Sequence, residues 1–569
     1  MNRKGSIRKK KEKKEREETA APGWTFWGRR YPKTILVMVA LACLLPFAAK
    51  AFHIDDPLFV WAGRQMQTRW WDPYGFDVNW YGSAMPMHEV TKNPPLACVC
   101  IALIMSIFGE NEFALHIGFL LQAIAVVLGT YALARRLCDH PIHAALAALF
   151  TPVFMVSSTT LMCDVLMVAL WVWAVVLWMR GLEDNRPLLL VLAAFLVGAC
   201  SLAKYFGIAL IPLLLAYSLM RNGRPGWWLV YLLIPLAIIG LYEGAMRALY
   251  GHGLMWDAFS YASPNEVHGA GAIFFKVLTA LGFAGGGCAI VLIFMPVLLR
   301  SKSWVGAAIV ALFLLPTTWI LSGSLPASAE SPARLGITLL WTLLILGGLG
   351  VLALPILEWK RHRNAETLML LFWVWGTFVF CVLNWTVNGR SVLPMVPAVA
   401  ILLLRRIEFV RKSTKLQLNW FFGAAALLSL LVSFADYRLA NSARGAAAEI
   451  QSKFGNSSVP VWFQGHWGFQ YYAQANGLRA FDFTNPQTRP GDLLVVPFNN
   501  TNLKPIYLDT VERVAIIEMP VSPWVATMSR AVGAGFYTDV VGPLPFSFGS
   551  VPGDGYYVFR LKAEGAAIR

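Results

Sequence analysis

Long apolar runs alternate with short polar segments over most of this 569-residue chain. A helix needs about 20 predominantly apolar residues to cross a bilayer, and about thirteen runs reach or approach that length. They lie at 34–52, 114–134, 143–160, 163–180, 187–201, 206–220, 227–249, 273–299, 304–322, 335–357, 367–387, 391–404 and 419–435. The shorter run Pro94–Phe108, between Lys92 and Glu110, predicts a re-entrant or interfacial helix instead. The pattern therefore predicts a transmembrane domain over residues 33–440, with a large first loop at 53–113.

The pattern changes after the last apolar run. From Ser442 onward, short β-rich runs alternate with segments rich in Gly, Pro and Asn. These runs lie at 459–463, 493–496, 514–517 and 556–561. We predict a small soluble α/β or β-rich domain over residues 441–569. All eight cysteines precede it, so it contains no disulfide, and its His466 is more readily interpreted as a packed loop histidine than as a ligand contact.

Composition supports the same class of protein. Hydrophobic residues make up 57% of the chain, charged residues only 14%, and the mean hydropathy is +0.55. These values exclude an ordinary soluble globule. The tail over residues 1–32 carries nine Lys or Arg between Arg3 and Glu18, which predicts a disordered cytoplasmic segment rather than a signal peptide.

The distribution of Lys and Arg predicts the orientation. If the amino end is cytoplasmic, every second loop should be basic, and the loops near residues 135, 180, 221, 300, 360 and 405 are. With thirteen spans, the first loop and the C-terminal domain lie on the opposite side of the membrane. This predicts a multi-pass protein of the inner membrane with both segments in the periplasm.

An adjacent carboxylate pair opens the first loop. Asp55 and Asp56 follow the first apolar run by three residues, and self-repulsion makes such a pair costly unless a cation, a proton or a reaction uses it. The alternative is a solvated loop with an Asp N-cap. His53 beside them would add a third ligand for a divalent metal, but without a fixed geometry this spacing is weak support for a metal site.

Six cations depart from the expected orientation pattern, because they fall on the far side of the membrane, where Lys and Arg should be scarce. They are Arg64, Arg69, Lys92, Lys204, Arg334 and Arg390. Each alone is most simply a boundary residue whose charge reaches the interface. Together, at the mouth of a bundle that carries two Asp, they predict a site for phosphate or pyrophosphate.

Four segments, in order along residues 34–404, resemble one family of membrane enzymes. They are the acidic pair after the first helix, the stretch 91–96 leading to 107–114, the Asp at 164 near a helix start, and the segment 388–397. They resemble the GT-C glycosyltransferases that use polyprenyl-phosphate sugars, in particular the protein O-mannosyltransferases and the aminoarabinose transferase. The chain departs from that pattern at Asp56, where relatives tend to have Glu, at Lys92, which precedes Asn, and at Ser391, where Tyr is common.

The resemblance implies a GT-C fold and sugar transfer from a polyprenyl-phosphate donor. Such a reaction needs a base for the acceptor hydroxyl and cations for the departing phosphate. We expect Asp55 to be the base, with Asp56 orienting the acceptor or tuning the pKa of Asp55. Lys92 and Arg390 are the expected phosphate contacts.

The resemblance also implies a role for Asp164, which would position the first loop or the acceptor; the alternative is an Asp that caps the helix starting at Val165. Lys204, Arg334 and His53 complete the expected substrate-binding set. No cofactor is expected, because this chemistry does not need a metal to activate phosphate.

Two functions from different classes remain open at this point. The first is the transferase, whose expected partners are the lipid-linked donor, the bilayer and a protein, lipid or glycan acceptor, with no nucleic acid. The second is a transporter or flippase of a lipid-linked or anionic solute, in which the Asp pair would couple protons. The sequence contains no phosphate-binding loop motif, so it does not indicate an ATP-driven pump.

Overall fold

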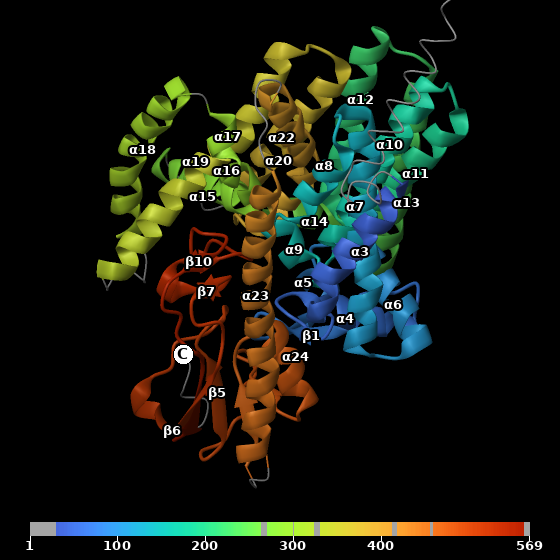
Figure 1. Ribbon diagram of the computed structural model, residues 1–569. Coiled ribbons are helices and arrows are strands. Elements are labelled where there is room, and N and C mark those ends of the chain that lie inside the picture. The colour runs from blue at the N-terminus through green and yellow to red at the C-terminus, as the bar shows by residue number, and fades with distance from the viewer. Residues whose placement is uncertain are drawn as a thin grey trace, which may run out of the picture.

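The computed structural model describes residues 30–262, 270–299, 301–323, 331–411, 418–455 and 459–562. Nearly all of the predicted basic tail, residues 1–29, lies outside them. Helices predominate in the described chain as far as Phe454, and most strands follow it (Figure 1). The arrangement matches the predicted order of a helical membrane part followed by a mixed domain.

Most helices follow the predicted apolar runs. They are α3 (Pro32–Leu44), α7 (Glu112–Leu137), α8 (Pro141–Leu149), α9 (Pro152–Ser157), α10 (Cys163–Glu183), α11 (Pro187–Ala203), α12 (Leu210–Asn222), α13 (Leu233–Tyr250), α14 (Leu254–Ala262), α15 (Ala270–Gly287), α16 (Ala289–Ile293), α17 (Met295–Leu298), α18 (Ser301–Ser322), α19 (Ser331–Arg361), α20 (Ala365–Leu383), α21 (Gly389–Val392), α22 (Val396–Arg411) and α23 (Asn419–Phe454). Short 3-10 turns extend or join several of them: η1 (Leu45–Phe47), η2 (Tyr205–Ala209), η3 (Trp227–Leu232) and η5 (Leu393–Met395).

Eight helices in the described chain are long and apolar enough to cross a membrane, and four apolar helices are shorter. The eight correspond to eight of the predicted runs, and three of the shorter ones, α3 with η1, α11 and α15, correspond to three more. The fourth shorter helix is α6 (Leu96–Phe108), the predicted re-entrant or interfacial segment. The predicted class, a polytopic α-helical membrane protein, is confirmed.

The remaining two predicted runs are not continuous helices, and run 273–299 is also divided, into α15, α16 and α17. Run 143–160 is divided into α8 and α9, because Thr151 is extended ahead of Pro152 and a residue before proline disfavours the helical region. Run 391–404 is divided into α21, the turn η5 and α22, with Pro394 in the turn. Apolar composition predicted the length of both segments but not these prolines' effect on the helix.

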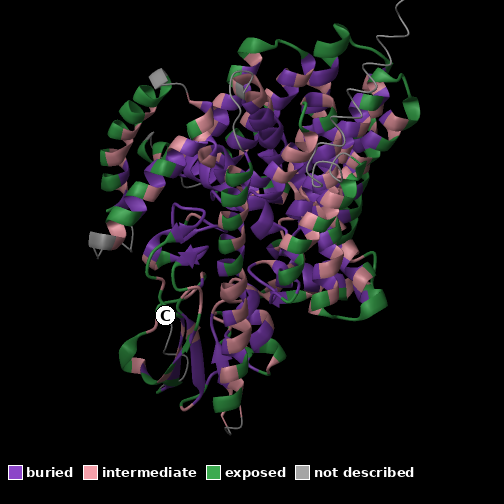
Figure 2. Ribbon diagram, in the orientation of Figure 1, coloured by how far each residue is buried: buried purple, intermediate pink, exposed green. Residues whose placement is uncertain are grey.

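Apolar side chains on the outer helices are exposed. Figure 2 shows α18 mostly exposed along its length, although Leu312, Phe313 and Ile320 are among its residues. Since α18 is one of the eight helices of spanning length and composition, this surface fits contact with lipid rather than water. The protein interior instead holds the helices around α10.

The first loop contains short elements that lie against the C-terminal domain. They are α4 (Asp56–Thr68), the hairpin strands β1 (Asp77–Asn79) and β2 (Ala84–Pro86), α5 (Met87–Val90) and α6. Asn79 Nδ2 donates to the carbonyl of Phe481 at 3.0 Å, and the Phe483 N–H donates to the carbonyl of Gly82 at 2.7 Å. The first loop and the C-terminal domain therefore lie on the same side of the helical part.

Helix α23 continues from the membrane part into the C-terminal domain, where it packs on α24 (Trp467–Ala475) (Figure 1). The predicted boundary at residue 441 thus falls inside one continuous helix. A five-stranded sheet in the order β4-β3-β5-β11-β6 forms the domain's centre. Its strands are β3 (Val461–Phe463), β4 (Arg479–Ala480), β5 (Leu493–Pro497), β6 (Val511–Met519) and β11 (Asp554–Leu561).

The sheet is mixed, and its strands confirm the four predicted runs. Strand β3 pairs in parallel with β4 and β5, whereas β11 pairs antiparallel with β5 and β6. Shorter strands follow β6: β7 (Val525–Ala526), β8 (Met528–Ser529), β9 (Ala534–Gly535) and β10 (Ser547–Phe548). Figure 1 shows β7 and β10 beside α23, at the end of the domain nearest the helices.

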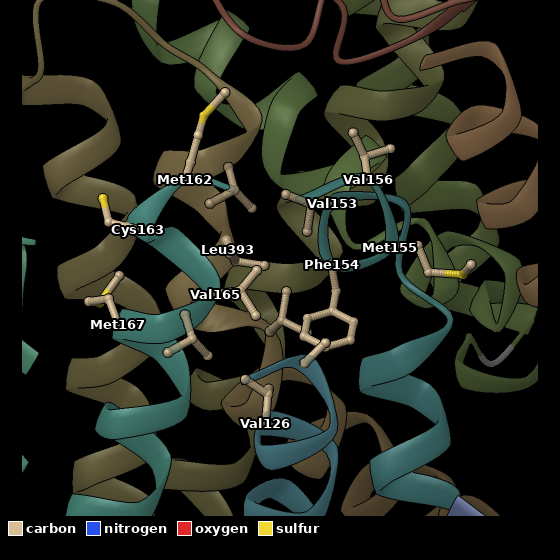
Figure 3. Close-up of a cluster of buried hydrophobic side chains, with 14 of the residues drawn as sticks. Val126, Val153, Phe154, Met155, Val156, Met162, Cys163, Val165, Met167 and Leu393 are labelled. Carbon is tan, nitrogen blue, oxygen red and sulfur yellow. The ribbon is translucent and has the colours of Figure 1, made fainter. Parts of the chain in front are cut away.

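A tightly packed core lies beneath the start of α10. Figure 3 shows Val153 and Phe154 of α9 beside Val165 of α10 and Leu393 of η5, with Val126 of α7 below them. All five side chains are buried. Because close-packed interiors resist displacement, this core fixes the position of the first turn of α10, which carries Asp164.

Candidate active site

The two neighbouring aspartates point in different directions. Ile54 has a positive φ of 49°, and this turn brings the chain into α4, with Asp55 at its N-cap position and Asp56 as its first residue. The side chain of Asp55 is partly exposed and lines a cavity, whereas Asp56 is fully buried. This turn therefore leaves one carboxylate at the cavity and the other in the protein interior.

Asp56 holds the backbone together beneath the cavity. Its carboxylate accepts the N–H of His53 at 2.9 Å and the N–H of Leu161, just before α10, at 2.8 Å. Burial raises the pKa of Asp56 to about 7, although these two N–H groups and the charge of Lys50 act in the opposite direction. The expectation that Asp56 orients an acceptor does not fit this enclosed position. Asp56 instead ties the first loop to the start of α10.

Arg390 contacts Asp55 directly at the cavity wall. Asn388 caps α21 by accepting the N–H of Ser391 at 2.9 Å, and the next turn presents Arg390. Arg390 Nη1 lies 2.9 Å from Asp55 Oδ2. Burial alone would lower the pKa of Arg390, but the carboxylates of Asp55 and Asp164 reverse this, so its pKa is raised and the guanidinium stays charged.

Two lysines complete a cationic lining. Lys204 follows α11, and its Nζ lies 2.5 Å from Asp164 Oδ1 on the first turn of α10. Lys92 donates to the backbone carbonyl of Glu89 at 2.6 Å and lies over the ring of Tyr261 at 5.5 Å. Burial lowers the pKa of Lys92. Unlike Lys204 and Arg390, Lys92 has no carboxylate within ion-pair distance among the described residues.

These side chains share one cavity of about 590 Å³. Of the residues predicted for the site, it is lined by Asp55, Lys92, Asp164, Lys204 and Arg390. Aromatic and C-terminal-domain residues complete the wall, among them Trp80, Tyr81, Tyr261, His466, Trp467, Thr501, Asn502, Tyr537 and Thr538. Three cations and two carboxylates in one cavity, with aromatic rings beside Lys92 and Arg390, can bind an anionic group and leave a carboxylate next to it.

Other predicted residues lie elsewhere. His53 is buried behind the cavity, with Nε2 at 3.6 Å from Asp436 Oδ1, so it does not contact a substrate there. Arg334 on α19 donates to the carbonyl of Trp319 at 2.7 Å and lies over the Trp319 ring at 4.2 Å. This position contradicts its assignment to the anion site. The snorkelling interpretation suits Arg334 better, since its guanidinium lies against the neighbouring helix α18.

The two other far-side cations also lie outside the cavity lining. Arg64 forms an ion pair with Glu110 at 2.5 Å, and more than half of its side chain is exposed. Arg69 follows α4 and is exposed. Three of the six far-side cations therefore converge as the sequence predicted, and three do not.

A buried ion pair beside the site was missed in the sequence. Lys50 Nζ lies 2.5 Å from Asp436 Oδ2, and both side chains are fully buried. Tyr537 donates its hydroxyl to the same oxygen at 2.9 Å, and Thr527 donates to the other at 2.8 Å. A signal existed, because Lys50 interrupts the first apolar run and Asp436 follows the last; ionisable residues there are rarely without a role. No signal in the sequence pointed to Tyr537.

His466 combines the two interpretations considered for it. It is buried, its Nε2 lies 2.7 Å from Thr501 Oγ1, and its ring packs on Trp80 at 4.7 Å. Burial lowers its pKa to about 3, so the imidazole is neutral near pH 7. It is a packed loop histidine as expected, and it also lines the cavity.

Within the part of the chain that the structure describes, no group of three or more His, Cys, Asp or Glu has an arrangement that could hold a metal ion. His53 in particular points towards Asp436 rather than joining Asp55 and Asp56 around a common centre. The observed cavity is therefore best described by its organic cations and carboxylates.

Residues 92–242 match the family model for dolichyl-phosphate-mannose-protein mannosyltransferases. The matched segment begins at Lys92 and includes Asp164 and Lys204, three of the five predicted residues that line the cavity. Over residues 92–242, this match agrees with the resemblance to the protein O-mannosyltransferases that the sequence indicated. A comparison with curated protein sequences gave no match.

Several solved structures are similar to this chain at low identity. For the Archaeoglobus fulgidus oligosaccharyltransferase tethered with an acceptor peptide, identity is 13%, coverage 80% of this chain and 64% of that one, and the TM-score 0.44. For ArnT from Cupriavidus metallidurans bound to undecaprenyl phosphate, identity is 15%, the match covers 84% of this chain and 94% of that one, and the TM-score is 0.42. For the arabinofuranosyltransferase AftD from Mycobacteria, identity is 13%, the match covers 94% of this chain and 40% of that one, and the TM-score is 0.37. The chain thus spans less than two thirds of the length of the first of these proteins.

Proposed function

We propose that this protein is a membrane glycosyltransferase that transfers a sugar from a polyprenyl-phosphate donor to an acceptor hydroxyl on the extracytoplasmic side. The observation that carries the proposal is the convergence of Asp55 with Arg390, Lys92 and Lys204 on one cavity. A carboxylate that accepts a proton next to cations that bind phosphate is the set of groups that this reaction requires.

The cations would bind the donor's phosphate. Arg390 presents a planar guanidinium that suits a bidentate contact with phosphate oxygens. Lys92 has no carboxylate partner among the described residues, so its charge is available to a ligand. Lys204 is already paired with Asp164, which favours a supporting role at the rim of the phosphate site.

Asp55 would act as the general base. Its carboxylate takes the proton of the acceptor hydroxyl while the acceptor oxygen bonds to the anomeric carbon of the sugar. The bond between that carbon and the phosphate oxygen breaks, and its electron pair leaves with the polyprenyl phosphate. Positive charge from Arg390 and Lys92 stabilises that leaving group.

Asp164 would position rather than react. Its carboxylate pairs with Lys204 at 2.5 Å and contributes to keeping Arg390 charged. The pair joins α10 to the end of α11 at the cavity wall, on the rigid core shown in Figure 3. Asp164 would thus order the cations rather than contact the acceptor.

The test uses purified protein in vesicles of defined lipid with a labelled polyprenyl-phosphate sugar and a mixture of hydroxyl-bearing acceptors. Covalent transfer of label to an acceptor is expected in the wild type. In Asp55→Asn the rate should fall by about 10² to 10⁴, because the amide cannot take the proton. Asp509→Asn, an exposed aspartate in the C-terminal domain, is the matched control and should transfer normally.

The same vesicles distinguish the transporter alternative. Movement of the labelled lipid or of an anion across the bilayer, with no covalent product and no loss in Asp55→Asn, would contradict the transferase. A mass spectrum of any lipid that co-purifies with the protein would identify the donor's sugar and chain length. The acceptor class, whether protein, lipid or glycan, follows from which member of the mixture becomes labelled.

A further inference from the structure

The C-terminal domain contributes backbone contacts to the loop that carries Arg390. The N–H of Gly389 donates to the carbonyl of Phe536 at 2.7 Å, and the N–H of Asp539 donates to the carbonyl of Val387 at 3.0 Å. Residues 536–539, which follow β9, therefore bond to residues 387 and 389 immediately before Arg390. We call residues 536–539 the bracing segment.

Side chains reinforce this contact. Thr386 Oγ1 lies 2.9 Å from Thr538 Oγ1 and donates to Asp539 Oδ1 at 2.5 Å. Phe536 is fully buried, and a Cβ added at Gly389 would lie 2.8 Å from its ring. A side chain at position 389 would therefore clash with Phe536, and the hydrogen bonds hold the loop against the bracing segment.

Tyr537 connects this brace to the buried ion pair. Its hydroxyl donates to Asp436 Oδ2 at 2.9 Å, and Asp436 is held in turn by Lys50. Its ring packs edge-on against His53 at 5.2 Å, while the guanidinium of Arg390 lies 5.8 Å from the ring centre. Tyr537 is also part of the cavity wall. One side chain thus contacts the segment before Asp55, the helix α23 and the cation opposite Asp55.

We propose that Tyr537 is a positioning residue: the bracing segment sets Arg390 opposite Asp55, and the Lys50–Asp436 pair acts on the site through the tyrosine hydroxyl. The inference rests on the proposed function and gives the C-terminal domain a part in it. A displacement of about 1 Å in a catalytic contact can cost about 10²-fold in rate. The turnover rate should therefore depend strongly on how the C-terminal domain holds Arg390.

The experiment compares Tyr537→Phe with Tyr507→Phe. The first removes one hydroxyl and keeps the ring beside Arg390; the second removes the hydroxyl of an exposed tyrosine in the same domain. Transfer should fall about 10- to 100-fold in Tyr537→Phe and stay unchanged in Tyr507→Phe. Equal rates in both variants would overturn the proposal.

A double-mutant cycle separates positioning from general destabilisation. Binding of a polyprenyl phosphate should weaken in Tyr537→Phe, yet Tyr537→Phe should add nothing to the loss already caused by Arg390→Ala, because both changes act through one contact. Additive losses would mean that Tyr537 affects stability alone, and would also overturn the proposal.

Hydrogen exchange provides a readout that does not depend on activity. The peptide containing residues 386–391 should exchange faster in Tyr537→Phe, because the Gly389 N–H bond to Phe536 loosens. Faster exchange in a protein that transfers no sugar would retain the brace and reject the proposed function. Unchanged exchange in a protein that does transfer sugar would reject the brace and retain the function.

Discussion

Asp55→Asn should tighten phosphate binding while it slows transfer. In the wild type Asp55 Oδ2 accepts an N–H from Arg390 at 2.9 Å. A donor phosphate that binds Arg390 must therefore compete with this carboxylate for the same guanidinium. Asparagine keeps the size of the side chain but lacks the charge, so the competitor is weakened while Arg390 stays in place.

The size of the effect follows from the environment of the ion pair. About a quarter of the Asp55 side chain and a sixth of the Arg390 side chain are exposed. An exposed pair contributes at most about 1 kcal/mol, and a hydrogen bond to a charged group up to about 3 kcal/mol. Removing the competing charge should therefore raise the affinity for phosphate by about fivefold to about 150-fold.

The assay is isothermal titration calorimetry, in which detergent-solubilised protein is titrated with a polyprenyl phosphate of defined length. Asp509→Asn is the control for a lost negative charge outside the cavity, and Arg390→Ala should weaken binding. An Asp55→Asn variant that binds the phosphate no better than wild type, with Arg390 present, would refute the competition and the assignment of Arg390 to phosphate.

Two further predictions concern phosphate binding by Lys92 and the pH dependence of stability that Asp56 causes. Lys92→Ala should weaken binding of a polyprenyl phosphate by about 10- to 150-fold, whereas Arg334→Ala, outside the cavity, should leave the same titration unchanged; equal effects would contradict the division of the far-side cations. Asp56 has a pKa of about 7 in the folded protein and 3.8 as a free group. Between these pH values the folded state binds more protons than the unfolded state, so the free energy of unfolding falls as pH rises. Melting curves from pH 4.5 to 8 should show a smaller slope for Asp56→Asn, and parallel curves would argue against a buried, protonated Asp56.

The helices were predictable because the requirement is local. A run of about 20 apolar residues must be helical in lipid to satisfy its own backbone, and this holds whatever the rest of the chain does. The exceptions, near Pro152 and Pro394, are also local, but a count of apolar residues does not weigh a proline's effect on the residue before it.

The site was predictable only as a set of charges on one side of the membrane. The predicted topology placed Asp55, Lys92 and Arg390 together, because it assigned each of them to a loop on the far side. It did not distinguish Asp55 from Asp56, since that depends on the positive φ of Ile54 and on the N–H of Leu161, over a hundred residues away.

Partnerships across the chain lay beyond the sequence for the same reason. The pair of Asp55 and Arg390 joins residues 335 positions apart, and the bond from Tyr537 to Asp436 joins residues 101 positions apart. Neither has a spacing rule of the kind that links residues on one helix face. Only the packed three-dimensional arrangement selects these partners from many chemically equivalent side chains.

The bracing segment has a consequence for how the protein is made. Arg390 takes its backbone contacts from residues 536–539, so its final setting waits until nearly all of the chain has been synthesised and the C-terminal domain has folded against the helices. A nascent chain that already contains Asp55, Lys92 and Arg390 still lacks the contacts that hold them in register. We therefore expect a chain that ends before Phe536 to insert its helices without the contacts that set Arg390 beside Asp55.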